Sequence, residues 1–169
     1  MQKKIEIMWA NKLGLNKFDV ELFEELINLM IETKVDYTIF FRELSNIPDD
    51  ISSIEKSFYG SLKNEIIIER WNSWLEKWKS FINVNDKKSK ESLSNQMKLI
   101  NPKYTLREWH LVWAYQEAEN GNYEPVNELQ EIMTNPYDEQ TKEIEEKYYT
   151  KKPSDFFGIA GISHVSCSS

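Results

Sequence analysis

The sequence contains few of the residues from which catalytic and metal sites are commonly built. Among 169 residues there are one cysteine and two histidines: Cys167, His110 and His164. One thiol cannot form an internal disulfide, and these three residues do not have the spacing of zinc ligands. None of the five glycines belongs to a phosphate-binding G-x-G-x-x-G or G-x-x-x-x-G-K-[ST] motif. We therefore expect no catalytic, cofactor-binding or metal-binding residue in this chain.

Glycine, proline and long apolar runs are also scarce, and each shortage excludes a class of protein. Five glycines and five prolines are too few for a collagen-like or low-complexity chain, and they disfavour an all-β sandwich, whose tight turns need these residues. No run of about 18 apolar residues is present, so we expect no membrane-spanning helix. The first residues lack the apolar core of a secretory signal, and a lone cysteine favours a reducing compartment. We therefore expect an intracellular protein, cytoplasmic or mitochondrial.

Acidic side chains outnumber basic ones. The formal net charge is −7, from 21 basic and 28 acidic side chains. Nucleic-acid-binding domains are usually basic, and here the longest basic cluster, 87–90, is flanked by Asp86 and Glu91. We interpret this cluster as the solvated start of a helix and expect no nucleic-acid partner. Three acidic pairs are expected to be solvated helix side chains rather than catalytic carboxylates: Asp49-Asp50, Glu24-Glu25 and Glu145-Glu146.

The dominant positive signal is a helical pattern of apolar residues. Leu, Ile, Val and Phe make up about a quarter of the chain, which is enough to build a core. Apolar residues recur at helical spacing from Lys4 to Pro136, whereas the residues after Pro136 are polar or irregular apart from a short helix expected at 142–149. We predict an all-α fold: an irregular bundle of about eight helices in a domain over 1–136, with a partly extended C-terminal tail over 137–169.

Capping residues predict where several of these helices begin and end. Side chains of Asp, Ser and Thr accept hydrogen bonds from the free N–H groups of a first turn, and glycine commonly ends the last turn. The expected N-caps are Asp19, Asp36 and Asp86, with capping boxes at Ser52/Glu55 and Thr105/Glu108, helix-ending glycines at Gly14 and Gly121, and Pro125 at the first position of a helix.

The most regular stripe of large side chains lies between Glu65 and Ile82. Trp71, Trp74 and Trp78 fall on one face of this predicted helix, because they recur at spacings of three and four residues. Such a row of rings suits either of two roles. The rings pack in a core between helices, which we favour because large aromatic residues dominate core energetics. Alternatively, they line a cavity and stack on a small-molecule ligand.

Each histidine has both a structural and a functional interpretation. His110 follows Trp109 within an apolar predicted helix, and no nucleophile lies near it in sequence, so we favour a hydrogen-bonded structural histidine over a catalytic base. His164 lies three residues before Cys167 and would lower the pKa of its thiol if the tail folded the two together. We favour the alternative, in which His164 is a tail residue with no such role.

The second half of the chain contains several distinctive short motifs. They are N-P-K-Y at 101–104, R-E-W at 107–109, A-E at 118–119 followed by Gly121 and Tyr123, N-P-Y-D-E-Q at 135–140 and the terminal S-C-S-S at 166–169. With K-L-G-L at 12–15, D-Y-T at 36–38 and F-R-E-L at 41–44, these motifs resemble the C-terminal region of the selenoprotein O family. The resemblance is strong after about residue 100, and residues 45–100 match poorly.

The resemblance implies a protein-kinase-like fold that transfers AMP from ATP to hydroxyl side chains of other proteins, with the nucleotide bound in a flipped orientation. It places the residues that bind phosphate and metal, and therefore ATP and Mg²⁺, in a kinase-like core that precedes the region matched here. It assigns no catalytic residue to this chain. Because the family has a selenocysteine or cysteine third from the C-terminus, the resemblance makes Cys167 a candidate redox residue.

We therefore expect this chain to be the C-terminal helical segment of such an adenylyltransferase, without the catalytic core and inactive alone. Its expected partners are the kinase-like core and, for the intact enzyme, protein substrates. Two alternatives remain open at this point. One is a non-catalytic helical interaction module that acts in trans, and the other is an independent small-molecule binder that uses the tryptophan stripe.

Overall fold

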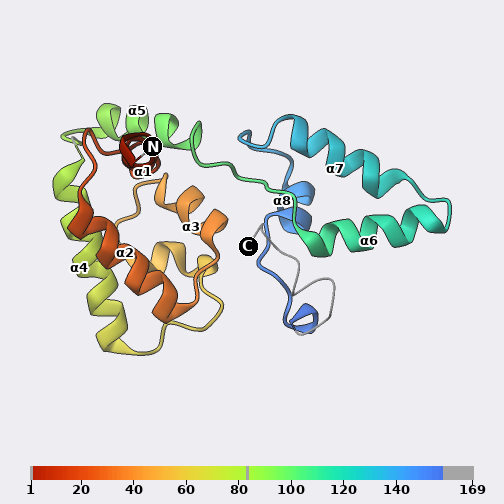
Figure 1. Cartoon of the computed structure of the whole chain (residues 1–169), viewed down its shortest axis with the longest axis horizontal. Helices are drawn as coiled ribbons and strands as arrows, with labels where there is room; N and C mark the ends of the chain where they lie inside the picture. The colour runs from red at the N-terminus through yellow and green to blue at the C-terminus, as the bar shows by residue number, and fades with distance from the viewer. Residues whose placement is uncertain (1, 83, 158–169) are drawn as a thin grey trace. The chain divides into compact units, whose positions relative to one another are not determined.

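The computed structural model describes residues 2–82 and 84–157, and within these ranges it confirms the all-α prediction. The described residues form helices joined by loops, with one isolated antiparallel bridge between Val35 and Phe58. The α-helices are α1 Gln2–Lys12, α2 Val20–Thr33, α3 Tyr37–Leu44, α4 Glu65–Phe81, α5 Lys87–Lys98, α6 Glu108–Glu119, α7 Glu124–Thr134 and α8 Lys142–Tyr148 (Figure 1). Two 3₁₀ helices, η1 Ile51–Ser57 and η2 Ser154–Phe156, complete the order.

The chain forms two compact units, Met1–Asn101 and Pro102–Ser169. This division differs from the expected boundary after Pro136. The reason is that the segment after α7 packs with the segment before α6: the backbone N–H groups of Lys103 and Tyr104 donate to the Pro136 carbonyl at 2.9 and 3.0 Å. Residues 137–149 therefore share a unit with 102–136. His164 and Cys167 lie outside the described residues.

Three of the predicted N-caps form as the sequence indicates. The carboxylate of Asp19 accepts from the Leu22 N–H at 2.9 Å, and that of Asp36 accepts from the Ile39 N–H at 3.1 Å. Asp86 accepts from the Ser89 N–H at 2.7 Å, and the Ser89 hydroxyl accepts from the Asp86 N–H in return. These short-range bonds satisfy N–H groups that the first turn of a helix leaves free.

The two predicted capping boxes do not form. At the first, Asp50 is the N-cap and accepts from the Ser53 N–H at 3.1 Å, and the segment that follows is the 3₁₀ helix η1. At the second, α6 begins at Glu108 with no side-chain cap, because the chain before it is extended and pairs with Pro136. Longer-range contacts thus override the local capping signal at Thr105.

The tryptophan stripe lies in the core of the first unit, as favoured from the sequence. Trp71 and Trp78 are 0% exposed and Trp74 is 2% exposed. The indole N–H of Trp74 donates to the Leu22 carbonyl at 2.9 Å, and that of Trp78 donates to the Leu13 carbonyl at 2.8 Å. The rings therefore contribute apolar burial and also attach α4 to α2 and to the loop after α1.

Candidate functional sites

The family-like stretches of the first unit meet in one polar cluster around Asn101. We define the Asn101 cluster as Lys12, Tyr37, Phe41, Arg42, Ser45 and Asn101. The Lys12 ammonium donates to the Asn101 side-chain oxygen at 2.9 Å, and the Asn101 side-chain nitrogen donates to the Lys12 carbonyl at 2.9 Å and to the Ser45 hydroxyl at 3.0 Å. Asn101 is 1% exposed. One amide side chain thus connects the ends of α1 and α3.

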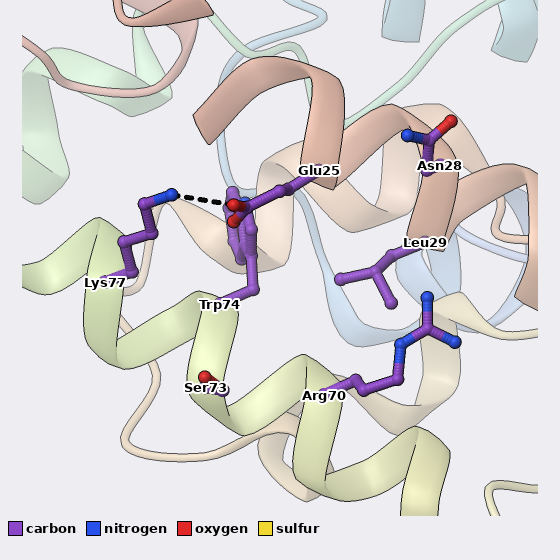
Figure 2. Close-up of a pocket in the computed structure, with 7 residues that line it drawn as sticks. All are labelled: Glu25, Asn28, Leu29, Arg70, Ser73, Trp74 and Lys77. Atoms are coloured by element: carbon purple, nitrogen blue, oxygen red, sulfur yellow. Dashed lines mark hydrogen bonds and ion pairs between the residues drawn. The ribbon is translucent and has the colours of Figure 1, made fainter. Parts of the chain in front are cut away.

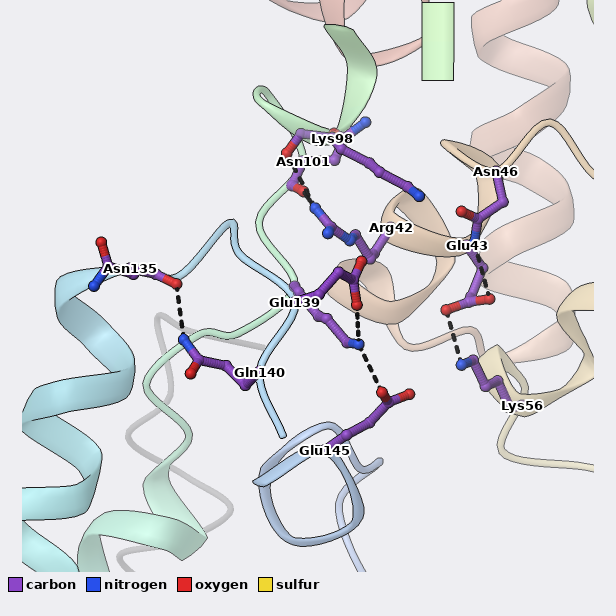
Figure 3. A network of polar contacts seen from close by, with 11 residues as sticks. Arg42, Glu43, Asn46, Lys56, Lys98, Asn101, Asn135, Glu139, Gln140 and Glu145 are labelled. Atoms are coloured by element: carbon purple, nitrogen blue, oxygen red, sulfur yellow. Dashed lines mark hydrogen bonds and ion pairs between the residues drawn. The ribbon is translucent and has the colours of Figure 1, made fainter. Parts of the chain in front are cut away.

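Arg42 is the buried cation of this cluster. Its guanidinium donates to the Lys98 carbonyl at 3.1 Å and to the Asn101 carbonyl at 3.2 Å (Figure 3). Carbonyl groups at the end of a helix lack intrahelical partners and carry a partial negative charge, so a cation is favourable there. Arg42 therefore fixes the chain where α5 ends.

Lys12 lies over two aromatic rings. Its Nζ atom is 5.1 Å from the ring centroid of Tyr37 and 4.7 Å from that of Phe41. Burial lowers the pKa of the Lys12 ammonium from 10.5 to about 8, and burial raises the pKa of the Tyr37 phenol to about 12. Lys12 is therefore the group in this cluster whose charge changes nearest to physiological pH.

The family-like stretches of the second unit meet around Lys103. We define the Lys103 cluster as Lys103, Tyr104, Pro136, Glu139, Glu145 and Tyr149. The Lys103 ammonium, 5% exposed, donates to Glu145 at 2.8 Å and also pairs with Glu139. Figure 3 shows Glu139 on the loop after α7 and Glu145 on α8. Glu145 is therefore paired, not simply solvated as expected.

The Lys103 ammonium stays charged despite its burial. Burial by itself lowers the pKa of Lys103, but hydrogen bonds to Glu139 and Glu145 outweigh this effect and raise the pKa above its ordinary value. The rings of Tyr104 and Tyr149 lie 5.8 and 5.2 Å from the nitrogen. The cluster holds the loop after α7 in place.

His110 is buried among aromatic rings in the second unit. It is 7% exposed, with the ring of Trp109 at 5.3 Å and that of Tyr148 at 5.0 Å. Burial, and then the positive charges of Arg107 and Lys147, lower the pKa of the imidazole to about 4. A general acid or base works best with a pKa near the working pH, so this environment supports the structural interpretation of His110.

A shallow groove runs between α2 and α4, beside the tryptophan stripe. It encloses about 390 Å³, and Trp74 is the one member of the stripe that lines it. Figure 2 shows Lys77 paired with Glu25 across this groove, at 2.7 Å, and Arg70 pairs with Glu32 at 2.8 Å. Because Trp74 is 2% exposed, its ring offers no face on which a ligand could stack. The geometry therefore does not support the small-molecule hypothesis based on this stripe.

Among residues 2–82 and 84–157, no three His, Cys, Asp or Glu side chains are grouped so that they could hold a metal ion. Over the same described ranges, no helix is both long enough and apolar enough to cross a membrane.

Sequence reasoning did not identify Arg42, Asn101 or Lys103 as site residues. The sequence does contain an indication that Arg42 is buried. This charged residue lies between Phe41 and Leu44, on the apolar face of a short helix. Lys12 likewise lies on the face of α1 that is otherwise apolar. The partners of these residues are up to 89 positions away, which no local pattern reveals.

The fold is helical, and its family-like motifs meet in two clusters. The buried cations of these clusters bond to groups of the same chain and so contribute to its own packing. Residues 1–134 match the family model for Protein adenylyltransferase SelO. The chain therefore belongs to this family, as the motifs predicted.

Curated relatives show the same relationship. The chain is 35% identical over 172 residues to a Protein nucleotidyltransferase YdiU from Flavobacterium johnsoniae, covering 96% of this chain and 32% of that protein. It is 34% identical over 186 residues to the protein of that name from Photobacterium profundum, covering 100% and 34%. The corresponding match from Aromatoleum aromaticum is 33% identical over 168 residues, covering 96% and 32%. The chain thus spans about a third of the length of these relatives.

Proposed function

We propose that this chain is the C-terminal helical segment of a protein adenylyltransferase, an enzyme that transfers AMP from ATP to hydroxyl side chains of other proteins. In this role the segment supports a kinase-like core and is inactive by itself. The observation that carries the proposal is that Arg42 and Lys103 are buried and bonded to the chain's own carbonyl and carboxylate groups. Buried cations used in this way stabilise a particular arrangement of helices, and the family match supports the enzymatic context.

The proposal assigns ATP and Mg²⁺ to the core. Lys103 pairs with two carboxylates and Arg42 donates to two carbonyls, so neither of these buried cations is arranged to bind a nucleotide phosphate. The described residues likewise include no group of ligands suited to a divalent cation. In the intact enzyme the core would bind both, and residues 2–157 would maintain the fold on which the core rests.

A reconstitution experiment tests this role. The chain is mixed with the part of the Flavobacterium johnsoniae relative that it does not match, and transfer of AMP from α-labelled ATP to a protein acceptor is measured with Mg²⁺. The core fragment alone is the first control, and this chain alone is the second. We expect label transfer by the mixture to exceed the sum of the two controls and the chain alone to transfer none.

Two results would contradict the proposal and separate it from its alternatives. Calorimetric titration of the chain alone with ATP and Mg²⁺ should give no heat above dilution, and micromolar binding would favour an independent small-molecule binder. If the chain and the core fragment neither associate nor gain activity together, the better reading is a helical interaction module that acts in trans on other partners.

We further propose, on the family resemblance, that Cys167 is a redox switch of the intact enzyme. Two thiols, Cys167 and a cysteine outside this chain, would form a disulfide and pass two electrons and two protons to oxidised glutathione. Full-length enzyme is assayed for AMP transfer after oxidation and after reduction. Cys167→Ser should abolish any difference between the two states, and Ser168→Ala should leave it intact. A difference that survives Cys167→Ser would exclude this switch.

A further inference from the structure

We propose that Asn120 is a site of spontaneous deamidation and that the turn between α6 and α7 controls the rate of this reaction. Deamidation needs no enzyme and converts the side-chain amide of asparagine into a carboxylate. It is separate from AMP transfer and does not depend on the proposed function. The proposal rests on the conformation and hydrogen bonds of the α6–α7 turn, residues 120–123.

The motif that ends α6 places an unhindered backbone nitrogen directly after Asn120. The Gly121 N–H donates to the Ala118 carbonyl at 3.0 Å, and the Asn122 N–H donates to the Glu117 carbonyl at 2.9 Å. These two bonds form a Schellman motif, and Gly121 has the positive φ, +86°, that this motif requires. Because glycine has no Cβ, no side chain shields its nitrogen from the Asn120 side chain. Asn-Gly occurs once in the sequence.

The reaction is balanced with water as the only other reactant. The Gly121 nitrogen loses its proton to solvent and attacks the side-chain carbonyl carbon of Asn120. A C–N bond forms and closes a succinimide ring, and the bond from that carbon to the amide nitrogen breaks. The amide nitrogen takes up a proton and leaves as ammonia. Water then opens the ring at either of its carbonyl carbons, which leaves an aspartate or an isoaspartate.

The folded turn keeps the two reacting groups apart. The ψ of Asn120 is 6°, which directs the Gly121 nitrogen towards the backbone nitrogen of Asn120 and away from the Asn120 side chain. The side-chain nitrogen of Asn120 also donates to the Gln116 carbonyl at 2.9 Å. Ring closure therefore requires the α6–α7 turn to open first.

The turn can open without unfolding of the rest of the second unit. Asn120 and Gly121 are both exposed, at the end of the hairpin that α6 and α7 form (Figure 1). The Asn122 side chain adds two local bonds: it donates to the Glu117 carboxylate at 2.8 Å and accepts from the Glu124 N–H at 3.2 Å. Exposed helix ends held by local bonds open at a lower free energy than the whole fold. We therefore expect deamidation in the folded protein, at a reduced rate.

Deamidation weakens the end of α6. The last carbonyl groups of a helix carry a partial negative charge, so a new carboxylate is unfavourable there. In the aspartate product an oxygen replaces the nitrogen that donates to the Gln116 carbonyl, and the two oxygens repel each other. Residues 108–134 contain no lysine or arginine that could offset the added charge. The modification thus destabilises the connection between α6 and α7.

Peptide mass spectrometry of aged protein tests the proposal. The chain is incubated at pH 8, folded in one arm and unfolded in guanidinium chloride in the other, and deamidation of each asparagine is followed over time. We expect Asn120 to react first in both arms, and at least about tenfold more slowly in the folded arm. Asn122 is the comparator on the same turn. In guanidinium it should react at least about tenfold more slowly than Asn120, because the Tyr123 side chain shields the attacking nitrogen.

Two variants separate control by the turn from the chemistry itself. Asn122→Ala removes the two side-chain bonds of Asn122 but retains the reacting groups. It should speed deamidation of Asn120 by about threefold or more in the folded arm and leave the rate in guanidinium unchanged. The matched control, Asn127→Ala at an exposed position of α7, should change neither rate. The proposal is overturned if Asn120 is not the first asparagine to react in the folded chain, if its folded and unfolded rates are equal, or if Asn122→Ala leaves the folded rate unchanged.

Discussion

The indole rings of Trp74 and Trp78 lie nearly parallel, with planes 3° apart and centroids 6.2 Å apart, yet their N–H groups donate to different segments. Trp74 bonds to the Leu22 carbonyl in the first turn of α2, and Trp78 bonds to the Leu13 carbonyl just after α1. Neighbouring rings on α4 thus position two other parts of the first unit. The stripe defines the arrangement of helices as well as filling the space between them.

Removing one of these rings should be costly. We expect Trp74→Ala to lower the free energy of unfolding by about 3–5 kcal/mol, the range for deleting a buried aromatic side chain. Trp74→Phe retains most of the apolar contact but not the hydrogen bond and should cost about 1–2 kcal/mol. Urea unfolding followed by circular dichroism measures both. A loss below about 1 kcal/mol for Trp74→Ala would show that the ring is not part of the core.

Gly14 and Gly121 form a matched pair for separating backbone strain from steric overlap. Both have positive φ, +66° and +86°. A Cβ at Gly14 would lie 2.7 Å from the Met97 sulfur, whereas a Cβ at Gly121 would have no heavy atom of the described residues within 4 Å apart from its chain neighbours. We expect Gly121→Ala to cost about 1 kcal/mol from strain and Gly14→Ala to cost about 2–3 kcal/mol from strain and overlap together. Equal losses in urea unfolding would contradict the tight packing of Gly14 against α5.

The buried imidazole of His110 should make the protein less stable in mild acid. The folded-state pKa is about 4 and the ordinary value is 6.5, so between these pH values the unfolded chain binds the extra proton. The contribution of His110 to the free energy of unfolding is therefore present above pH 6.5 and is lost as the pH falls towards 4. We expect this loss to be about 1–3 kcal/mol. The free energy of unfolding is measured from pH 7 to pH 4 for wild type and His110→Gln. The variant should show a shallower decline, since the carboxylates are common to both proteins.

The Lys103 cluster should respond to alkaline pH instead. Because the folded-state pKa of Lys103 is raised, the contribution of Lys103 to stability is fully present below about pH 10.5. It is lost as the pH rises through the folded-state pKa. At neutral pH, Lys103→Met should cost about 1–3 kcal/mol by leaving Glu139 and Glu145 without their cation. The matched control is Lys142→Met. Lys142 is 88% exposed in its pair with Glu146, and its loss should change stability by less than about 0.5 kcal/mol. Thermal unfolding at pH 7.5 and pH 11 checks both variants.

Local signals in the sequence predicted much of the helical framework. Asp19, Asp36 and Asp86 each accept a hydrogen bond from an N–H group only three residues later. The local residue pattern was therefore enough to predict these helix caps. The capping box at Thr105 failed for a non-local reason. Its neighbours bond to Pro136, more than 30 residues away, and hold the chain extended.

The polar clusters could not be predicted from the sequence, because each combines residues from distant segments. Lys12 and Asn101 are 89 positions apart, and Lys103 and Glu145 are 42 apart. The motifs that carry the family resemblance nevertheless contain Lys12, Arg42, Asn101, Lys103 and Glu139. The resemblance thus pointed to the right stretches of chain, while the bonds that join them required the fold.

The bonds of Asn101 and Lys103 have a practical consequence for dissecting this protein. Boundaries between compact units usually lie in exposed, flexible linkers, which proteases cut readily. Here the residues on either side of Pro102 are 1% and 5% exposed, and each is hydrogen-bonded within its own unit. A trypsin site after Lys103 is protected because the side chain that the enzyme must capture is paired with two glutamates. Limited digestion will therefore cut elsewhere first, and separating the units cleanly requires genetic truncation, not proteolysis.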